Sequence, residues 1–215
     1  ALKSFFSGFV LLFVLAHFSH HLISALLPPL LPLISKDFSL SNAQAGLLVS
    51  AYNLAYGVSQ LPAGWLADRL GARLLITIGI SGVAVTGLLV GIAPGYVVMA
   101  GFLALMGIVG GGYHPSAAPL VSASVAEKNR GRALGLHQIG GTLSNFLSPF
   151  LAVWIANLLG GWRGSFISLS VVIFVFGILF YVLLGRVSQS APAEPKPSSN
   201  SGTAEESGRT NSRRL

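Results

Sequence analysis

The chain has 215 residues, of which 53% are hydrophobic and only 9% are charged. A soluble domain is usually about one quarter charged, so this composition excludes an ordinary soluble protein. The formal net charge is +7, but the basic residues lie in short loops and in the tail, as topology signals do, so we expect no nucleic-acid partner. The sequence has no cysteine, which excludes disulfides, thiolate metal ligands and cysteine nucleophiles.

Apolar stretches of near-membrane length fill most of the sequence from residue 5 to residue 184. Only helices or a closed barrel can span lipid, because every backbone polar group must be satisfied internally. Stretches this long and uniformly apolar predict helices rather than barrel strands. We therefore predict an all-α membrane protein whose main partner is the lipid bilayer. Its six transmembrane helices are expected at about 5–28, 45–61, 74–92, 96–125, 133–155 and 166–184.

Prolines predict where two of these helices are disturbed. Pro28, Pro29 and Pro32 are expected to loosen the end of the first helix, and Pro115 is expected to kink the fourth. Since the last predicted helix ends at about residue 184, we expect the six-helix bundle within residues 1–186. The remaining segment, 187–215, is rich in Pro and Ser, cannot bury apolar surface and is predicted to be a disordered cytoplasmic linker or tail.

Basic residues fall almost entirely on one side of the expected bilayer. The loops of that side and the two ends of the bundle hold Lys3, Arg69, Arg73, Lys128, Arg130, Arg132 and Arg186. The other side holds only Lys36 and Arg163. Because positive residues favour the cytoplasmic side, we predict a multi-pass protein of the inner or plasma membrane with both termini in the cytoplasm.

Polar side chains are concentrated in the first, second, fourth and fifth helices. In lipid such side chains turn towards the bundle interior or a water-filled cavity, so we expect these four helices to surround a polar path and the third and sixth to be peripheral. The residues expected to line the path for substrate or protons are His17, His21, Asn53, Tyr56, Gln60, Tyr113, His114, His137, Gln138 and Asn145.

Histidines are the only titratable groups expected at depth, because every Asp and Glu lies outside the predicted helices. His17 is expected near the midplane, and His114 and His137 are expected to be neighbours. For His17, His20 and His21 three interpretations stay open: contact with protons or substrate, structural hydrogen bonding, and metal binding by His17 and His21, one turn apart. Because neither a carboxylate nor a thiol is at hand to complete a metal shell, we predict no metal and no cofactor.

Small residues predict close contacts between helices. Gly107 and Gly111 form a small-xxx-small pair in the fourth helix, and Gly87 and Gly91 form another in the third. Such pairs allow two helix backbones to approach closely.

The loop between the second and third helices reads Gly64-Trp65-Leu66-Ala67-Asp68-Arg69-Leu70-Gly71-Ala72-Arg73. Gly64 permits close packing and Gly71 permits a positive φ. Asp68 can accept hydrogen bonds from a helix N-terminus and pair with Arg69 or Arg73, so we predict a gating latch on the cytoplasmic side. Its residues are Gly64, Asp68, Arg69, Gly71 and Arg73.

This loop resembles the signature G-x-L-x-D-R-x-G-R/K-R/K of the major facilitator superfamily, as do segments 127–133 and 161–163. A narrower resemblance, to the fosmidomycin-resistance group, is carried by residues 110–115 and 137–141 and by the histidine-rich first helix. That group is associated with drug efflux by proton antiport.

The resemblance implies one half of a twelve-helix permease, built from two three-helix repeats, with a second six-helix half as partner. The implied function is secondary transport of a small organic solute by alternating access, and not an enzymatic reaction. Two alternatives stay open. One is a membrane redox protein with haem held between histidines, and the other is a scaffold or sensor of the same fold that does not transport.

Overall fold

The computed structural model describes residues 8–189, with side chains from Phe9 to Arg186. The predicted tail and Lys3 lie largely outside the described residues. Within them all regular structure is helical, which confirms the predicted all-α class. The helices are α2 (Gly8–Ser24), α3 (Leu27–Asp37), α4 (Asn42–Leu70), α5 (Ala72–Gly91), α6 (Tyr96–Gly110), α7 (Tyr113–Ala123), the short 3-10 helix η1 (Glu127–Asn129), α8 (Arg130–Leu158) and α9 (Trp162–Gln189).

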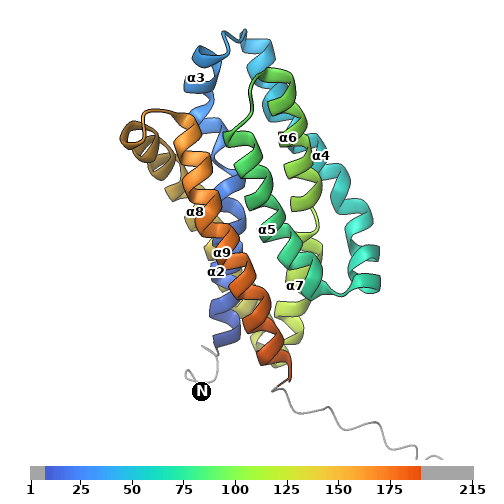
Figure 1. Cartoon of the computed structure of the whole chain (residues 1–215). Coiled ribbons are helices and arrows are strands. Elements are labelled where there is room, and N and C mark those ends of the chain that lie inside the picture. Colours follow the sequence, from blue (N-terminus) through green and yellow to red (C-terminus); the bar gives the residue numbers. More distant parts are fainter. Residues whose placement is uncertain (1–7, 190–215) are drawn as a thin grey trace, which may run out of the picture.

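Helix α2 forms the centre of the bundle and contacts α5, α7, α8 and α9. Figure 1 shows α5 and α9 side by side in front of α2, with α4 at one side of the bundle next to α6 and with α8 towards the other. The start of α2 and the end of α9 lie at the same end of the bundle (Figure 1). The α4–α5 turn and the α7–α8 connection lie towards that end too, so it carries most of the basic loops. That it faces the cytoplasm stays a prediction.

Five helical segments are long and apolar enough to cross a membrane: Phe9–Asp37, Ala72–Gly91, Tyr96–Ala123, Glu127–Leu158 and Trp162–Arg186. The sixth, α4, has 29 residues and is therefore about 43 Å long at 1.5 Å per residue. Its amides, serines and tyrosines make it less apolar than the others. Figure 1 shows α4 running along most of the bundle beside α6, as a sixth crossing helix would.

Two of the crossings are broken helices, and proline accounts for both breaks. The first breaks between α2 and α3 at Ala25, whose carbonyl has no donor four residues later because Pro29 lacks an N–H. The chain stays helical to Asp37, beyond the expected end at residue 28, because prolines are tolerated in the first turn of α3. The kink predicted from Pro115 is found between α6 and α7, where the carbonyl of Gly111 loses its donor in the same way.

The second crossing is longer than the apolar stretch 45–61. A capping box formed by Ser41 and Gln44 starts α4 at Asn42. The helix then continues through Pro62 to Leu70 and stops at Gly71, whose φ is +89°. The polar turns at both ends of α4 account for the difference, because they extend the helix beyond its apolar part.

Glycine pairs bring helices together as predicted. A Cβ atom at Gly107 of α6 would lie 2.5 Å from the carbonyl oxygen of Tyr52 in α4. At Gly91 of α5 it would lie 2.7 Å from a side-chain carbon of Ile167 in α9. No side chain fits at either position without a shift of its neighbours, so these contacts fix the α4–α6 and α5–α9 pairs.

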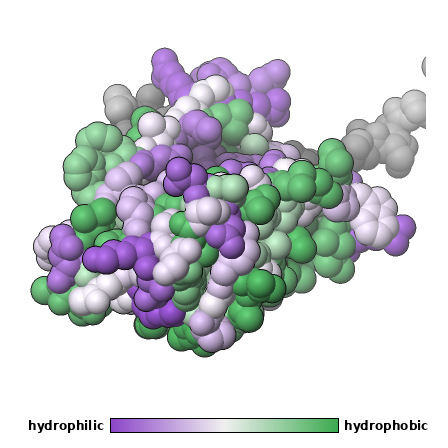
Figure 2. Space-filling view, turned by 90° about the horizontal axis from the view of Figure 1, so that it is seen from above, coloured by the Kyte–Doolittle hydropathy of each residue, from purple (hydrophilic) through white to green (hydrophobic). Residues whose placement is uncertain are grey.

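The outer surface of α5 and α9 is apolar. Its strongly exposed side chains include Ile78, Val85, Ile167, Val171, Val172, Val175, Ile178 and Leu179. Figure 2 looks onto the end of the bundle that carries the α3–α4 and α8–α9 connections. It shows hydrophilic residues on this end surface and hydrophobic residues along its margins. This distribution suits α5 and α9 to contact lipid.

Candidate functional site

All five histidines of the chain lie in one cluster: three contact His17, and His20 joins the cluster through His21 and His114. His17, His20 and His21 come from α2, His114 from α7 and His137 from α8. The His17 ring lies 4.2 Å from that of His137, 4.8 Å from that of His21 and 5.0 Å from that of His114, measured between centroids. His114 and His137 were expected to be neighbours. Both rings contact His17, which lies between them.

Hydrogen bonds to backbone carbonyls hold three of the five rings. His17 Nδ1 donates to the carbonyl of His137 at 2.8 Å, and His137 Nδ1 donates to the carbonyl of Phe13 at 3.1 Å. This reciprocal pair ties α2 to α8. His20 Nδ1 donates to the carbonyl of Gly79 at 2.9 Å and ties α2 to α5. These bonds fit the structural interpretation of the histidines, since each one links two helices.

The same bonds fix which ring nitrogen carries the proton. A carbonyl oxygen only accepts, so Nδ1 of His17 and of His20 must be protonated, and a neutral ring then has its lone pair on Nε2. Both Nε2 atoms are buried without a hydrogen-bond partner among the described residues. The hydroxyls of Tyr56 and Tyr113 are in the same situation. The centre of the bundle therefore holds a group of polar atoms with unused hydrogen-bonding capacity.

The residues predicted to line a path divide into two groups. His17, Tyr113 and His137 are buried, and the Tyr113 ring stacks on His20 with centroids 4.6 Å apart. His21 and His114 are half-buried, as are Tyr56 and Gln60 of α4. Asn53 of α4 and Gln138 and Asn145 of α8 are exposed. The path residues thus run from a buried aromatic cluster to amides on the surface.

The sequence analysis did not single out the apolar side chains that accompany these amides. They lie on the same two helices and include Leu54, Leu61, Trp65, Phe146, Phe150 and Trp154. Their helical spacing was the available signal, for example Phe146, Phe150 and Trp154 at steps of four. Together with Asn53, Gln138 and Asn145 they give α4 and α8 a mixed polar and apolar surface.

The predicted latch loop has the expected turn but different contacts. Arg73 donates to the carbonyl of Tyr181 in α9 at 2.6 Å, and its guanidinium lies 3.9 Å from the centre of the Tyr181 ring. Arg69 lies over the Trp65 ring at 4.1 Å. Among the described residues neither arginine pairs with Asp68. Asp68 lines a groove of about 360 Å³ together with Gly64, Pro115 and Pro119 and other residues of α4 and α7.

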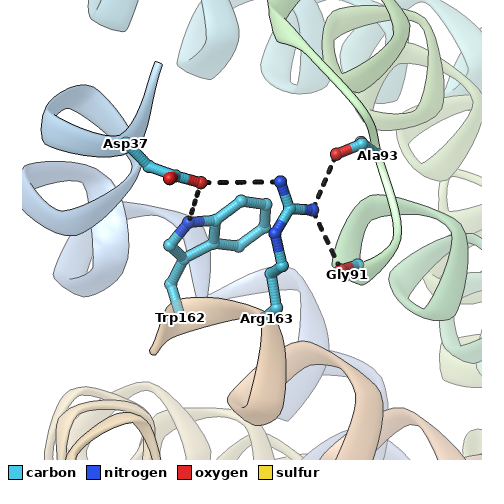
Figure 3. Close-up of polar contacts among 5 residues, drawn as sticks. All are labelled: Asp37, Gly91, Ala93, Trp162 and Arg163. Atoms are coloured by element: carbon cyan, nitrogen blue, oxygen red, sulfur yellow. Dashed lines mark hydrogen bonds and ion pairs between the residues drawn. The ribbon is translucent and has the colours of Figure 1, made fainter. Parts of the chain in front are cut away.

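A second charged group closes the opposite end of the bundle (Figure 3). Arg163 donates to the carbonyl of Ala93 at 2.6 Å and to that of Gly91 at 3.3 Å, and it forms an ion pair with Asp37 at 3.5 Å. The Asp37 carboxylate also accepts from Trp162 Nε1 at 3.1 Å. This group ties the start of α9 to the ends of α3 and α5. The sequence analysis noted residues 161–163 as a family feature and Arg163 as a basic residue of this side, but it did not predict these contacts.

The long apolar helices, the apolar outer surface of α5 and α9 and the charged groups at both ends indicate a multi-pass helical membrane protein. The chain belongs to the Major Facilitator Superfamily, whose family model matches residues 13–213. The narrower resemblance to the fosmidomycin-resistance group stays a prediction.

Curated relatives and solved structures agree with this family. The chain is 30% identical to the D-galactonate transporter of Escherichia coli O6:H1 over 69% of its own length and 34% of that protein. It is 30% identical to the "Probable sulfoacetate transporter SauU" of Cupriavidus necator over 69% of its length and 34% of that protein. A bacterial homologue of the human lysosomal transporter Spinster, in an inward-facing conformation, shares the fold. Its TM-score is 0.72 at 20% identity, over 84% of this chain and 43% of that one. The chain thus spans less than half of the length of these proteins.

Proposed function

We propose that this chain forms one half of a secondary transporter that moves a small organic anion across a membrane by alternating access. Family membership supports transport, and two relatives are named for galactonate and sulfoacetate, both small organic anions. The shared half-transporter fold supports movement of this half against another around a site near the midplane. A transporter of this kind is not an enzyme and needs no cofactor.

The observation that carries the proposal is the exposure of Asn53, Gln138 and Asn145. Asn53 and Asn145 lie near the middle of α4 and α8, and therefore at membrane depth. An amide exposed at this depth is costly against lipid, so such residues face a water-filled cavity or a partner. The half-buried His21 and His114 lie on α2 and α7, which connect α8 to α4 across the bundle.

A second six-helix half is the partner that fits this surface. The exposed aromatic and aliphatic side chains on α4 and α8, such as Trp65 and Phe150, are interleaved with the amides. Large apolar groups rimmed by polar ones are typical of interaction surfaces. A partner half would cover the apolar groups and leave the amides and histidines to line the path. The groove beside Asp68 would then receive the partner at the cytoplasmic end.

For energy coupling we propose protons, with His21 and His114 as carriers. They are the partly exposed histidines of the cluster, whereas the other three rings are buried and hydrogen-bonded to carbonyls. Histidine titrates near ordinary pH, which suits a proton carrier. Proton antiport with export of a drug-like compound, which the fosmidomycin-resistance resemblance implies, is the alternative coupling mode.

Flux in liposomes tests the proposal. Full-length protein is reconstituted, and uptake of radiolabelled galactonate is measured with and without a pH gradient of either sign. The double variant Gln138→Leu with Asn145→Leu is expected to lower the flux at least tenfold at unchanged protein content. The matched control is Val172→Ala on the lipid-facing surface of α9, which is expected to keep the flux. Equal flux in the double variant and wild type would remove the α8 amides from the path, and absence of flux for every organic anion tried would refute the transporter.

A further inference from the structure

We propose that His17, His21 and His114 form a binding site for one divalent transition-metal ion, with Zn²⁺ as the best match. Each residue offers one ring nitrogen, and the three nitrogens lie within 4.8 Å of one another. His17 and His21 are one turn apart on α2, and His114 reaches them from α7. The sequence supplied only the α2 pair, and the fold supplies the third ligand. The proposal does not depend on the transporter assignment, but a bound ion would occupy His21 and His114, so metal binding and proton carriage by these two rings exclude each other.

The Nε2 atom of His17 has a free lone pair that can bind a metal ion. Its Nδ1 donates to the carbonyl of His137, which leaves the lone pair on Nε2. This Nε2 is buried and has no hydrogen-bond partner among the described residues. A histidine that ligates a metal commonly donates its other ring N–H to a carbonyl or carboxylate, and this bond fixes the ring and its tautomer. The His17–His137 bond provides that arrangement.

The other two ligands have the freedom to close around an ion. His21 and His114 are half-buried, and in the described part of the chain their rings are held by ring contacts rather than by hydrogen bonds. Two nitrogens on a tetrahedral Zn²⁺ at about 2.1 Å lie about 3.4 Å apart. Rotation of the His21 and His114 side chains therefore has to shorten the nitrogen separations by at most about 1.4 Å. This is a side-chain movement that leaves α2 and α7 in place.

Ligand chemistry selects the class of ion. Imidazole nitrogen suits Zn²⁺, Ni²⁺, Co²⁺ and Cu²⁺, whereas Mg²⁺ and Ca²⁺ require oxygen ligands. The carboxylates of the described segment, Asp37, Asp68 and Glu127, lie at helix ends away from the cluster. Three neutral ligands leave the double positive charge uncompensated in a low-dielectric site, which favours an anion at the fourth position.

Gly141 of α8 keeps the space beside these ligands free. A Cβ atom at this position would lie 2.6 Å from His17 Nε2 and 3.0 Å from Cδ2 of His21. The glycine therefore allows α8 to pass directly beside the proposed ligand atoms. A methyl group there would press on the ligand nitrogen without removing any histidine.

Metal titration of the full-length protein tests the site. The protein is purified in detergent, freed of any affinity tag containing histidine, treated with chelator and titrated with Zn²⁺ by calorimetry. Co²⁺ is used in parallel for its visible absorption. We expect one ion per chain and a four-coordinate Co²⁺ spectrum. His21→Ala, His114→Ala and Gly141→Ala are each expected to weaken binding at least tenfold.

His20→Gln is the matched control, because the amide can still donate to the Gly79 carbonyl and His20 is not among the three ligands. It is expected to bind Zn²⁺ like the wild type, and circular dichroism of every variant confirms that the helices are intact. Failure of wild type to bind Zn²⁺ or Co²⁺ stoichiometrically, or equal affinity of His114→Ala and wild type, would overturn the proposal. Either result would leave the transporter proposal standing, because no flux is measured.

Discussion

Replacement of Arg163 by alanine tests which interactions stabilise the contact between the start of α9 and the ends of α3 and α5. The guanidinium makes hydrogen bonds to the carbonyls of Gly91 and Ala93 at the end of α5 and an ion pair with Asp37. It also lies 4.4 Å from the centre of the Trp162 ring and 5.6 Å from that of Phe38. The side chain of Arg163 is 38% exposed and that of Asp37 is 47% exposed. The ion pair with Asp37 and the hydrogen bonds to the carbonyls therefore contribute different free energies, and separate substitutions of Arg163 and Asp37 distinguish them.

An exposed ion pair contributes about 0.2–1 kcal/mol. A hydrogen bond that involves a charged group contributes about 1.5–3 kcal/mol, and a cation at a helix C-terminus adds about 0.3–1 kcal/mol. Because Arg163 is partly exposed, we take the lower end and expect Arg163→Ala to cost about 2 kcal/mol. Asp37→Asn loses only the ion pair, since the amide oxygen still accepts from Trp162 Nε1, and is expected to cost less than about 1 kcal/mol.

Thermal unfolding of the full-length protein in detergent, followed by circular dichroism at the helix band, compares the two variants. The drop in Tm for Arg163→Ala is expected to be at least twice that for Asp37→Asn. Lys36→Ala removes an exposed neighbouring cation and is expected to change Tm little. The reasoning is refuted by an equal or larger drop for Asp37→Asn, which would make the ion pair the main fastening, or by an equal drop for Lys36→Ala, which would indicate a general charge effect.

Three further substitutions, with one control, test helix packing and the end of the bundle that carries the α4–α5 turn. Gly107→Ala forces α4 and α6 apart, because its Cβ would lie 2.5 Å from the Tyr52 carbonyl. It should lower the free energy of unfolding by about 1–3 kcal/mol and therefore lower Tm. Gly101→Ala is the control, because its Cβ would meet nothing within 4 Å; equal Tm values for the two variants would contradict the packing argument. Arg73→Ala should also lower Tm, because it unties α5 from the Tyr181 carbonyl, and an unchanged Tm would count against that contact. Asp68→Asn should keep Tm but lower liposome flux at least tenfold; normal flux would remove the groove from gating.

Local chemical signals made much of the fold predictable. The break at Gly111 follows from Pro115 four residues later. The positive φ of Gly71 follows because this single residue connects α4 to α5 and reverses the chain direction. The glycine pair of α6 predicted a close helix contact without saying which helix supplies it. Signals of this kind act within one turn of helix, and sequence alone is enough to interpret them.

Partners distant in the sequence were not predictable in the same way. Asp68 was expected to pair with Arg69 or Arg73, but Arg73 contacts Tyr181, 108 residues away, and Arg69 lies over the Trp65 ring. His114 and His137 were expected to be neighbours, and the fold brings them together through His17, which contacts both rings and which the sequence did not indicate as the link. Both outcomes depend on the rotation of one helix relative to another. That rotation is set by the packing of whole surfaces, and no short motif records it.

Glycines around the histidine cluster explain how helices that are distant in the sequence bring these rings together. A Cβ atom at Gly79 of α5 would lie 2.9 Å from Cβ of Tyr113, so this glycine admits the start of α7. Gly141 of α8 does the same for His17. The break before Tyr113 frees α7 from the direction of α6, which lets His114 turn towards α2. Gly79 and the adjacent pair Gly140 and Gly141 therefore leave room where α5, α7 and α8 approach the histidines of α2, whereas Gly111 serves the contact with Ser59 of α4.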